Sequence, residues 1–295
     1  MSTPVTFPAG GETCVGRLYG DAPGPADARK PCVVLCHGFG GTQDTPAFTA
    51  TARDFVRAGY LALTLDYRRF GESSGLPRQL VNIADQLDDI AAAVGHARTH
   101  PGVDPDRIVL WGTSLGGGHV VTAAARDPRI AAVIAQIPYN GFPRKVEGRS
   151  TAATLRLLAV MVRDATRGAL GLPPVYINQV GPAGETAVIA GARAQQTVDA
   201  MTSATWRNEV APRSLWDMWR YRPGDHASFV RAPLLVCLGA NDAETPAEKA
   251  AELARRAPRG ELRTYDHAHF EFYRDDVRRR VTADQLAFLA RVLPR

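Results

Sequence analysis

A serine flanked by glycines stands where an apolar stretch meets a helical period. Residues 112–116 read Gly-Thr-Ser-Leu-Gly and fit the pattern G-x-S-x-G, between a strand expected at 108–111 and a helix expected at 114–126. A sharp turn of this kind lifts the serine oxygen above a sheet, and it needs glycines because side chains there would collide with neighbouring backbone. We therefore predict that Ser114 is a catalytic nucleophile.

A serine hydroxyl is a weak nucleophile until a base removes its proton, so a histidine and an orienting carboxylate are expected downstream. The apolar stretch 234–238 runs into a turn that presents Asp242, and Glu244 is the alternative acid. A later loop carries two histidines, His267 and His269, and spacing alone does not choose between them. The chain thus holds the three residue types of a hydrolase triad in the order Ser, Asp, His.

The elements that must position these residues alternate along the chain. Apolar strands are expected at 5–7, 14–19, 32–36, 60–66, 108–111, 130–137, 234–238 and 261–265. Helical periods are expected at 46–58, 80–99, 114–126, 246–256 and 276–293. This alternation predicts the α/β class, with a mostly parallel eight-stranded sheet and helices on both of its faces.

The alternation stops between Tyr139 and about Phe229, where helical stretches are expected with no strand between them, at 151–169, 186–201 and 212–219. We therefore predict an inserted helical lid at 139–229 and a core made of residues 1–138 and 230–295. An insertion after the sixth strand hangs over the carboxyl ends of the strands, where open α/β sheets bind ligands.

The predicted lid is rich in large apolar side chains. It contains Met201, Met218 and three of the four tryptophans, Trp206, Trp216 and Trp219. These aromatic residues, together with Tyr139, either line a substrate pocket or only give the insertion a core of its own.

Composition and charge exclude several classes of protein. The chain is 45% apolar and 22% charged, which is ordinary for a globular protein, and no apolar run approaches the roughly 18 residues that span a bilayer. The first ten residues lack the features of a signal peptide, so we expect a cytoplasmic protein without a membrane partner. The net charge is +5, but the arginines are scattered and the cluster 278–280 adjoins Asp275 and Asp276, so no nucleic-acid partner is expected.

No metal or cofactor site emerges from the sequence. The cysteines (Cys14, Cys32, Cys36 and Cys237) form no C-x-x-C pair and are expected to be reduced thiols, most of them in buried strands. Residues 38–41 do not complete G-x-G-x-x-G, and the carboxylates of Asp85, Asp88 and Asp89 are interpreted as the solvated face of an amphipathic helix.

The chain resembles the α/β-hydrolase superfamily, in particular its dienelactone-hydrolase-like and acetyl-xylan-esterase-like bacterial members. The motif His-Gly-Phe-Gly-Gly at 37–41 and the segment 66–73 carry part of the similarity. Residues 268–273 read Ala-His-Phe-Glu-Phe-Tyr, where such proteins commonly have Gly-His-Phe followed shortly by Tyr. The resemblance implies the α/β-hydrolase fold and favours His269 over His267 as the base.

The same resemblance implies an oxyanion hole made by the backbone N–H groups of Phe39 and Leu115. His37 is expected to bond within its own loop, and His119 to be packed or capped in the helix after Ser114.

The expected activity is that of a serine hydrolase that cleaves a carboxylic ester, lactone or thioester through an acyl-enzyme on Ser114. The expected partner is a small-molecule substrate with an apolar acyl group, and a homodimer is compatible with the sequence. The alternative is a lyase, a cyclase or a C–C bond hydrolase of natural-product, polyketide-like metabolism that uses the same triad.

Overall fold

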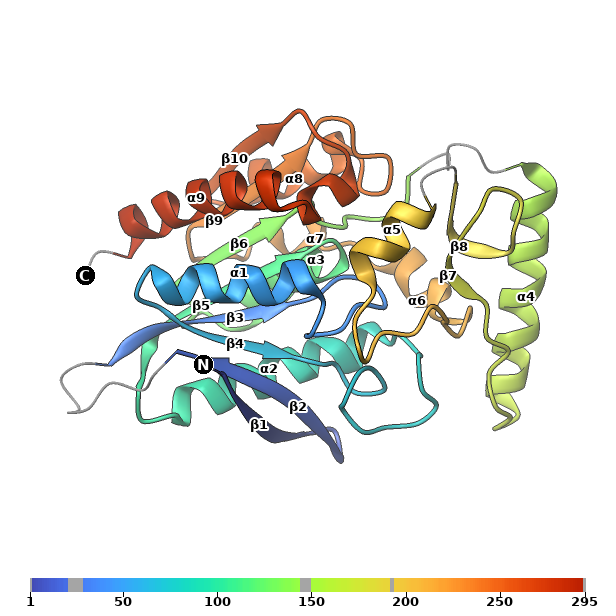
Figure 1. The fold of residues 1–295 in the computed structure, drawn as a ribbon, viewed down its shortest axis with the longest axis horizontal. Helices are drawn as coiled ribbons and strands as arrows, with labels where there is room; N and C mark the ends of the chain where they lie inside the picture. Colours follow the sequence, from blue (N-terminus) through green and yellow to red (C-terminus); the bar gives the residue numbers. More distant parts are fainter. Residues whose placement is uncertain (1, 21–28, 144–149, 192–193, 294–295) are drawn as a thin grey trace.

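A twisted sheet of eight strands, in the order β1-β2-β4-β3-β5-β6-β9-β10, occupies the centre of the molecule in the computed structural model, which describes residues 2–20, 29–143, 150–191 and 194–293 (Figure 1). β1 pairs with β2 and β2 with β4 in antiparallel fashion, and the other neighbours are parallel. The predicted mostly parallel eight-stranded sheet is therefore confirmed. The strands are β1 (Ser2–Ala9), β2 (Glu12–Tyr19), β3 (Lys30–Cys36), β4 (Leu61–Leu65), β5 (Val103–Thr113), β6 (Ala132–Gln136), β9 (Leu234–Gly239) and β10 (Gly260–Tyr265).

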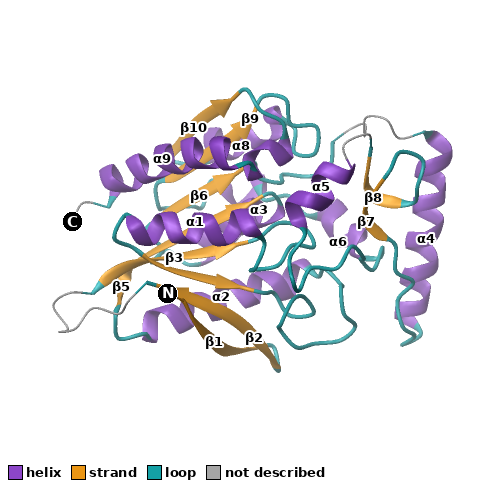
Figure 2. Cartoon of the chain, in the orientation of Figure 1, coloured by secondary structure: helices purple, strands orange, loops and turns teal. Residues whose placement is uncertain are grey.

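Helices cover both faces of the sheet, as Figure 2 shows. One face packs against α1 (Pro46–Arg57) and α9 (Asp275–Val292), and the other against α2 (Ile83–Thr99), α3 (Leu115–Arg126) and α8 (Ala247–Arg256). Alternation along β3 explains this layering, because Val33 and Leu35 belong to the first core and Cys32, Val34 and Cys36 to the second. No helix in the described ranges is long and apolar enough to cross a membrane.

The segment 139–229 follows β6 and lies beside the carboxyl ends of the parallel strands (Figure 1). It contains α4 (Thr151–Ala169), β7 (Asn178–Gly181), β8 (Ala187–Ala190), α5 (Ala194–Met201), α6 (Ser214–Arg220) and the short α7 (Gly224–Ala227).

The expectation that this segment contains helices and no strands is wrong. β7 and β8 form a small parallel sheet, and the helix expected at 186–201 begins only at Ala194. Val188 and Ile189 are β-branched and favour an extended backbone, and an apolar run of four residues is too short to show its period.

Asp44, in the loop before α1, ties the insertion to the core. Its Oδ1 accepts hydrogen bonds from the hydroxyls of Ser203 (2.7 Å) and Thr205 (2.8 Å), and its Oδ2 accepts one from the Thr205 N–H (3.1 Å). Burial alone would raise the pKa of Asp44, but these bonds and that of Thr42 lower it below the usual value. The insertion is therefore bound to the core through hydrogen bonds to an ionised carboxylate.

Asp89 corrects a second expectation, since it is fully buried and is not part of a solvated helix face. Its Oδ1 accepts from Arg68 Nε at 2.6 Å and its Oδ2 from the Arg68 backbone N–H at 2.9 Å. The ring of Tyr67, the residue before Arg68, packs edge-on against His37 with centroids 4.5 Å apart. The buried ion pair thus fixes the loop after β4 against the loop after β3.

Replacing Asp89 with Ala should lower the free energy of unfolding by about 3 kcal/mol, because it removes the nearer carboxylate from a buried guanidinium and leaves only the contact to Asp85 at 3.4 Å. Arg68 is only 5% exposed, so water cannot replace the carboxylate. The free energy of unfolding should fall much less in the double variant Arg68→Met, Asp89→Leu. Urea unfolding of the three proteins checks this, and equal losses in the single and double variants would contradict it.

Candidate active site

Ser114 lies on a strained turn between β5 and α3. Its φ of 56° and ψ of −121° fall in a region that residues with a side chain rarely adopt. A Cβ added at Gly112 would collide with the carbonyl of Gly116, and one added at Gly116 would collide with the carbonyl oxygens of Cys36 and His37. The two motif glycines are therefore required by the close approach of α3 to β3 and β5.

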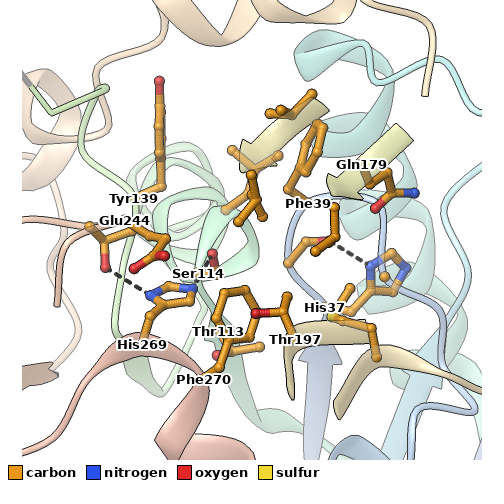
Figure 3. Close-up of a pocket in the computed structure, with 18 of the residues that line it drawn as sticks. His37, Phe39, Thr113, Ser114, Tyr139, Gln179, Thr197, Glu244, His269 and Phe270 are labelled. Atoms are coloured by element: carbon orange, nitrogen blue, oxygen red, sulfur yellow. Dashed lines mark hydrogen bonds between the residues drawn. The ribbon is translucent and has the colours of Figure 1, made fainter. Parts of the chain in front are cut away.

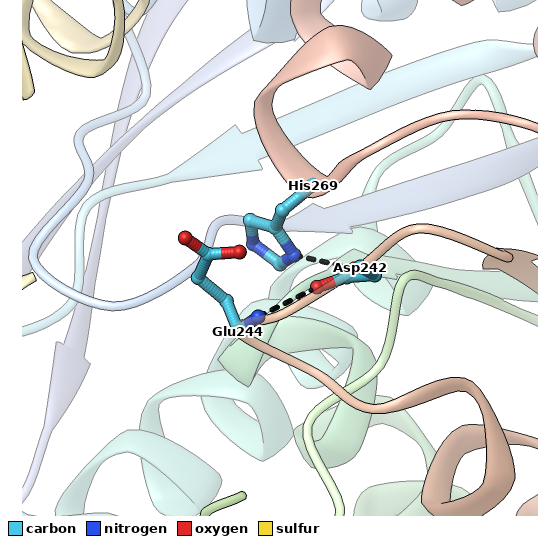
Figure 4. Close-up of side chains that lie close together, drawn as sticks. All are labelled: Asp242, Glu244 and His269. Carbon is cyan, nitrogen blue, oxygen red and sulfur yellow. Dashed lines mark hydrogen bonds and ion pairs between the residues drawn. The ribbon is translucent and has the colours of Figure 1, made fainter. Parts of the chain in front are cut away.

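His269 joins the serine to Asp242. Its Nε2 lies 3.0 Å from Ser114 Oγ, and its Nδ1 lies 2.7 Å from Asp242 Oδ2 (Figures 3 and 4). Asp242 lies in the turn after β9, and His269 begins the 3-10 helix η2 (His269–Tyr273) after β10. Because the carboxylate accepts a hydrogen bond from Nδ1–H, Nε2 carries no proton and is free to accept the proton of the serine hydroxyl.

His267 and His119 take no part in these contacts. His267 Nδ1 faces Glu271 Oε2 at 3.7 Å. His119 is buried in α3, with Nε2 2.9 Å from Gln86 Oε1 and Nδ1 3.2 Å from the Tyr221 hydroxyl, which agrees with the packed role expected for it.

Electrostatics favours an ionised carboxylate beside a basic imidazole. Burial would raise the pKa of Asp242, but the charge of His269 and hydrogen bonds from His269 and Thr245 lower it below the usual value. Burial would also lower the pKa of His269, but the charge and hydrogen bond of Asp242 outweigh it and raise that pKa above 6.5. His269 is thus a stronger base than an isolated imidazole.

Thr245 holds the carboxylate in place, and sequence reasoning missed it. Its N–H donates to Asp242 Oδ1 and its hydroxyl to Oδ2, both at 2.7 Å, and the Glu244 N–H adds a third bond to Oδ1 at 2.9 Å. An aspartate that accepts from backbone N–H groups two and three residues onward is typical of an Asx turn. The spacing Asp-x-x-Thr in the sequence was the signal that could have indicated this contact.

The loop after β3 approaches Ser114 from the other side. A Cβ at Gly38 would lie 2.9 Å from Ser114 Cβ, so only glycine leaves room there. Phe39 and Leu115 both line the cavity over Ser114, and the Leu115 N–H is the first of α3 and has no acceptor within the helix. His37 is buried with Nδ1 3.0 Å from Gly38 O, in its own loop as expected, and burial lowers its pKa to about 4.

Gln179 of β7 connects the insertion to this loop. Its Nε2 donates to Gly40 O (3.3 Å) and to the carbonyls of Arg207 (2.9 Å) and Glu209 (3.0 Å), and the residue is 1% exposed. Figure 3 shows Gln179 beside Phe39 and His37. Nothing in its sequence neighbourhood distinguishes it, because the contact joins residues 139 positions apart.

The cavity over Ser114 has a volume of about 160 Å³ and mostly apolar walls. The insertion supplies Tyr139, which was expected there, and a set of largely apolar side chains, namely Phe142, Val180, Val188, Ile189, Thr197, Met201 and Met218.

The three tryptophans of the insertion are not among the described residues that line this cavity. On α6, Leu215 and Met218 are buried, and Trp216 and Trp219, one position further along the helix, pack against each other with Trp219 56% exposed. Trp206 lies in the loop before α6, where its backbone N–H donates to Ser203 Oγ. Each step along a helix turns a side chain by about 100°, so methionine and not tryptophan faces the cavity.

Asp242, Glu244 and His269 also place three possible metal-ligand atoms within 4.8 Å of one another (Figure 4). Asp242 Oδ2 and His269 Nδ1 are already within hydrogen-bond distance of each other, so an ion bound by these two atoms would displace that bond. We therefore assign these atoms to the triad.

Comparisons with known proteins agree with this geometry. A family model described as serine aminopeptidase, S33, matches residues 27–276. The quorum-quenching protein AidA of Acinetobacter baumannii is 38% identical over 293 residues, which cover 98% of this chain and 95% of that protein. A thiohydrolase of Eupenicillium brefeldianum is 28% identical over 233 residues, covering 76% and 74% of the two chains.

The structure of DcsB in complex with its substrate analogue is similar in fold, with a TM-score of 0.83, 21% identity and 99% of each chain covered. Together with the match over residues 27–276, this shows that the chain belongs to the serine aminopeptidase S33 family and is a serine hydrolase with the α/β-hydrolase fold.

Proposed function

We propose that the protein hydrolyses esters, lactones or thioesters of a small apolar acyl group through an acyl-enzyme on Ser114. The observation that carries this proposal is the chain of contacts from Ser114 Oγ to His269 (3.0 Å) and from His269 to Asp242 (2.7 Å) beneath an apolar cavity. In this reading Ser114, His269 and Asp242 are the nucleophile, the base and the orienting acid.

In the first step His269 takes the proton of Ser114 as Oγ attacks the carbonyl carbon, and the backbone N–H groups of Phe39 and Leu115 stabilise the oxyanion. His269 then gives the proton to the leaving oxygen or sulfur, and the acyl group stays on Ser114. In the second step His269 activates a water molecule, which releases the acid and restores the serine.

The walls of the cavity support a small apolar acyl group. Its volume of about 160 Å³ lies below the 300 to 1,000 Å³ of pockets for drug-sized ligands. The insertion at 139–229 acts as the lid that encloses the acyl group in this proposal. The name of one relative, a thiohydrolase, supports thioesters as one class of substrate.

We also propose a cytoplasmic location. The cysteines Cys14, Cys32, Cys36 and Cys237 are free, buried thiols, and burial raises the pKa of each to about 12. Unreactive thiols without disulfides are typical of proteins from a reducing compartment.

A Ser114→Ala variant should lose about 10⁴- to 10⁶-fold in kcat on p-nitrophenyl butyrate, and Ser114→Ala, His269→Ala should be hardly worse, because the residues act as a unit. A fluorophosphonate probe should label the wild type on Ser114 and not the variant. Product analysis with a panel of butyrate esters and acyl thioesters should yield the free acid. An eliminated, cyclised or C–C cleaved product would favour the alternative activity instead.

The pH profile of kcat/KM should show one acid limb centred above pH 6.5. The reactive imidazole is neutral, so activity rises as pH rises through the pKa of His269, which Asp242 holds above its usual value. In Asp242→Asn the charge of Asp242 is gone, and burial, which lowers the pKa of His269, is opposed only by the charge of Glu244, so the limb should move to lower pH while the rate falls. An acid limb at the same pH in Asp242→Asn and in the wild type would show that a group other than His269 controls the pH profile.

Met201→Ala should shift the preferred p-nitrophenyl ester toward longer chains, with a change of about 10-fold in the ratio of kcat/KM between hexanoate and butyrate. Met201 lines the cavity and is buried, so its removal lengthens the space for the acyl chain. Met161→Ala is the matched control, because Met161 is equally buried in α4 but is not among the cavity-lining residues. The same shift in both variants would argue against a selective wall.

A further inference from the structure

One acidic side chain stands in the wall of the cavity. Of the described residues that line it, Glu244 alone carries a carboxylate, among mostly apolar neighbours. Figures 3 and 4 show that carboxylate beside the imidazole of His269. The backbone N–H of Glu244 supports Asp242, but that bond does not involve the side chain. The carboxylate is therefore directed toward the substrate space.

A carboxylate at the edge of an apolar cavity is only an acceptor of hydrogen bonds and a negative charge. Glu244 is half-buried, so its charge is partly removed from water and is stabilised by a donor that reaches it. A ligand that supplies a donor at this point would be favoured, and a ligand with a carboxylate there would be repelled.

The position of Glu244 relative to His269 determines which part of the substrate it meets. In the reaction proposed above, His269 Nε2 donates its proton to the leaving oxygen, so the leaving group must lie beside this imidazole. Possible ligand atoms of Glu244, His269 and Asp242 lie within 4.8 Å of one another. A donor on the second carbon of an alkoxy leaving group is then within reach of Glu244, and the acyl chain extends toward Met201 and Val188.

We infer that Glu244 is a specificity-determining residue that selects leaving groups with a hydroxyl or ammonium donor close to the scissile oxygen and rejects anionic ones. The inference rests on the proposed ester hydrolysis and adds the chemical class of the leaving group. The preferred substrate is then an apolar acyl ester of a polyol or amino alcohol, or a lactone whose ring carries a donor near the ring oxygen.

Three butyrate esters test this, because their leaving groups have nearly the same size: 2-hydroxyethyl, propyl and carboxymethyl. The wild type should prefer them in that order. In Glu244→Leu the ratio of kcat/KM for hydroxyethyl over propyl should fall about 10- to 100-fold, because the acceptor is lost. In Glu244→Gln, which keeps an acceptor but no charge, the ratio of carboxymethyl over propyl should rise about 10-fold.

Glu248→Gln is the matched control, because Glu248 lies in the first turn of α8, is exposed and is not among the described cavity-lining residues. It removes the same charge four residues away and should leave both ratios unchanged. Unchanged ratios in the Glu244 variants would overturn the inference, and so would a shifted pH profile with unchanged ratios, which would mean that Glu244 acts only through His269. Absence of hydrolysis of all three esters, with Ser114 unlabelled by a fluorophosphonate, would instead remove the proposed function itself.

Discussion

The close approach of α3 to the ends of β3 and β5 is the constraint on which the active site depends. Ser114 has a backbone conformation that is unfavourable for a residue with a side chain, and it is maintained because the surrounding elements are buried and rigid. Gly38 leaves space for the side chain of Ser114, and Gly112 and Gly116 leave space for the backbone of α3 against β5 and β3. One methyl group at Gly112 or Gly116 would push the helix away and move the nucleophile from His269.

Buried charges and polar groups hold the loops that surround this point. Asp242 is fixed by Thr245, Asp44 binds the insertion to the core, and the pair of Asp89 with Arg68 fixes the loop after β4. Asp242 accepts hydrogen bonds from its own turn, whereas Asp44 and Asp89 accept them from segments distant in the chain. Loops cannot form the regular hydrogen bonds of a sheet. Carboxylate acceptors replace those hydrogen bonds and hold the loops that carry the side chains of the site.

The sequence was sufficient for the strands of the main sheet, because apolar runs and turns are local signals. It also indicated Ser114, Asp242 and one of two histidines as residues after strands, and the structure brings Ser114, Asp242 and His269 together. It was insufficient wherever the result depends on rotation about a helix or on distant contacts. The tryptophans of α6 lie one position away from the face that meets the cavity. Asp89 resembles its solvated neighbours in sequence, and only the fold brings Arg68 to it. The strands β7 and β8 are too short for their sequences to show the alternation of apolar and polar residues that predicts a strand.

The site is divided between two parts of the chain with different tasks. The triad and the loop after β3 come from the core, while most of the apolar wall comes from the insertion, and Gln179 is a direct polar contact between the insertion and that loop. Changes in β8 or α5 can therefore alter the shape of the cavity without moving Ser114 or His269. Gln179 is different, because its amide binds Gly40 next to Phe39. A displacement of β7 would reach the loop beside Ser114, so this strand is the part of the insertion that is least free to change.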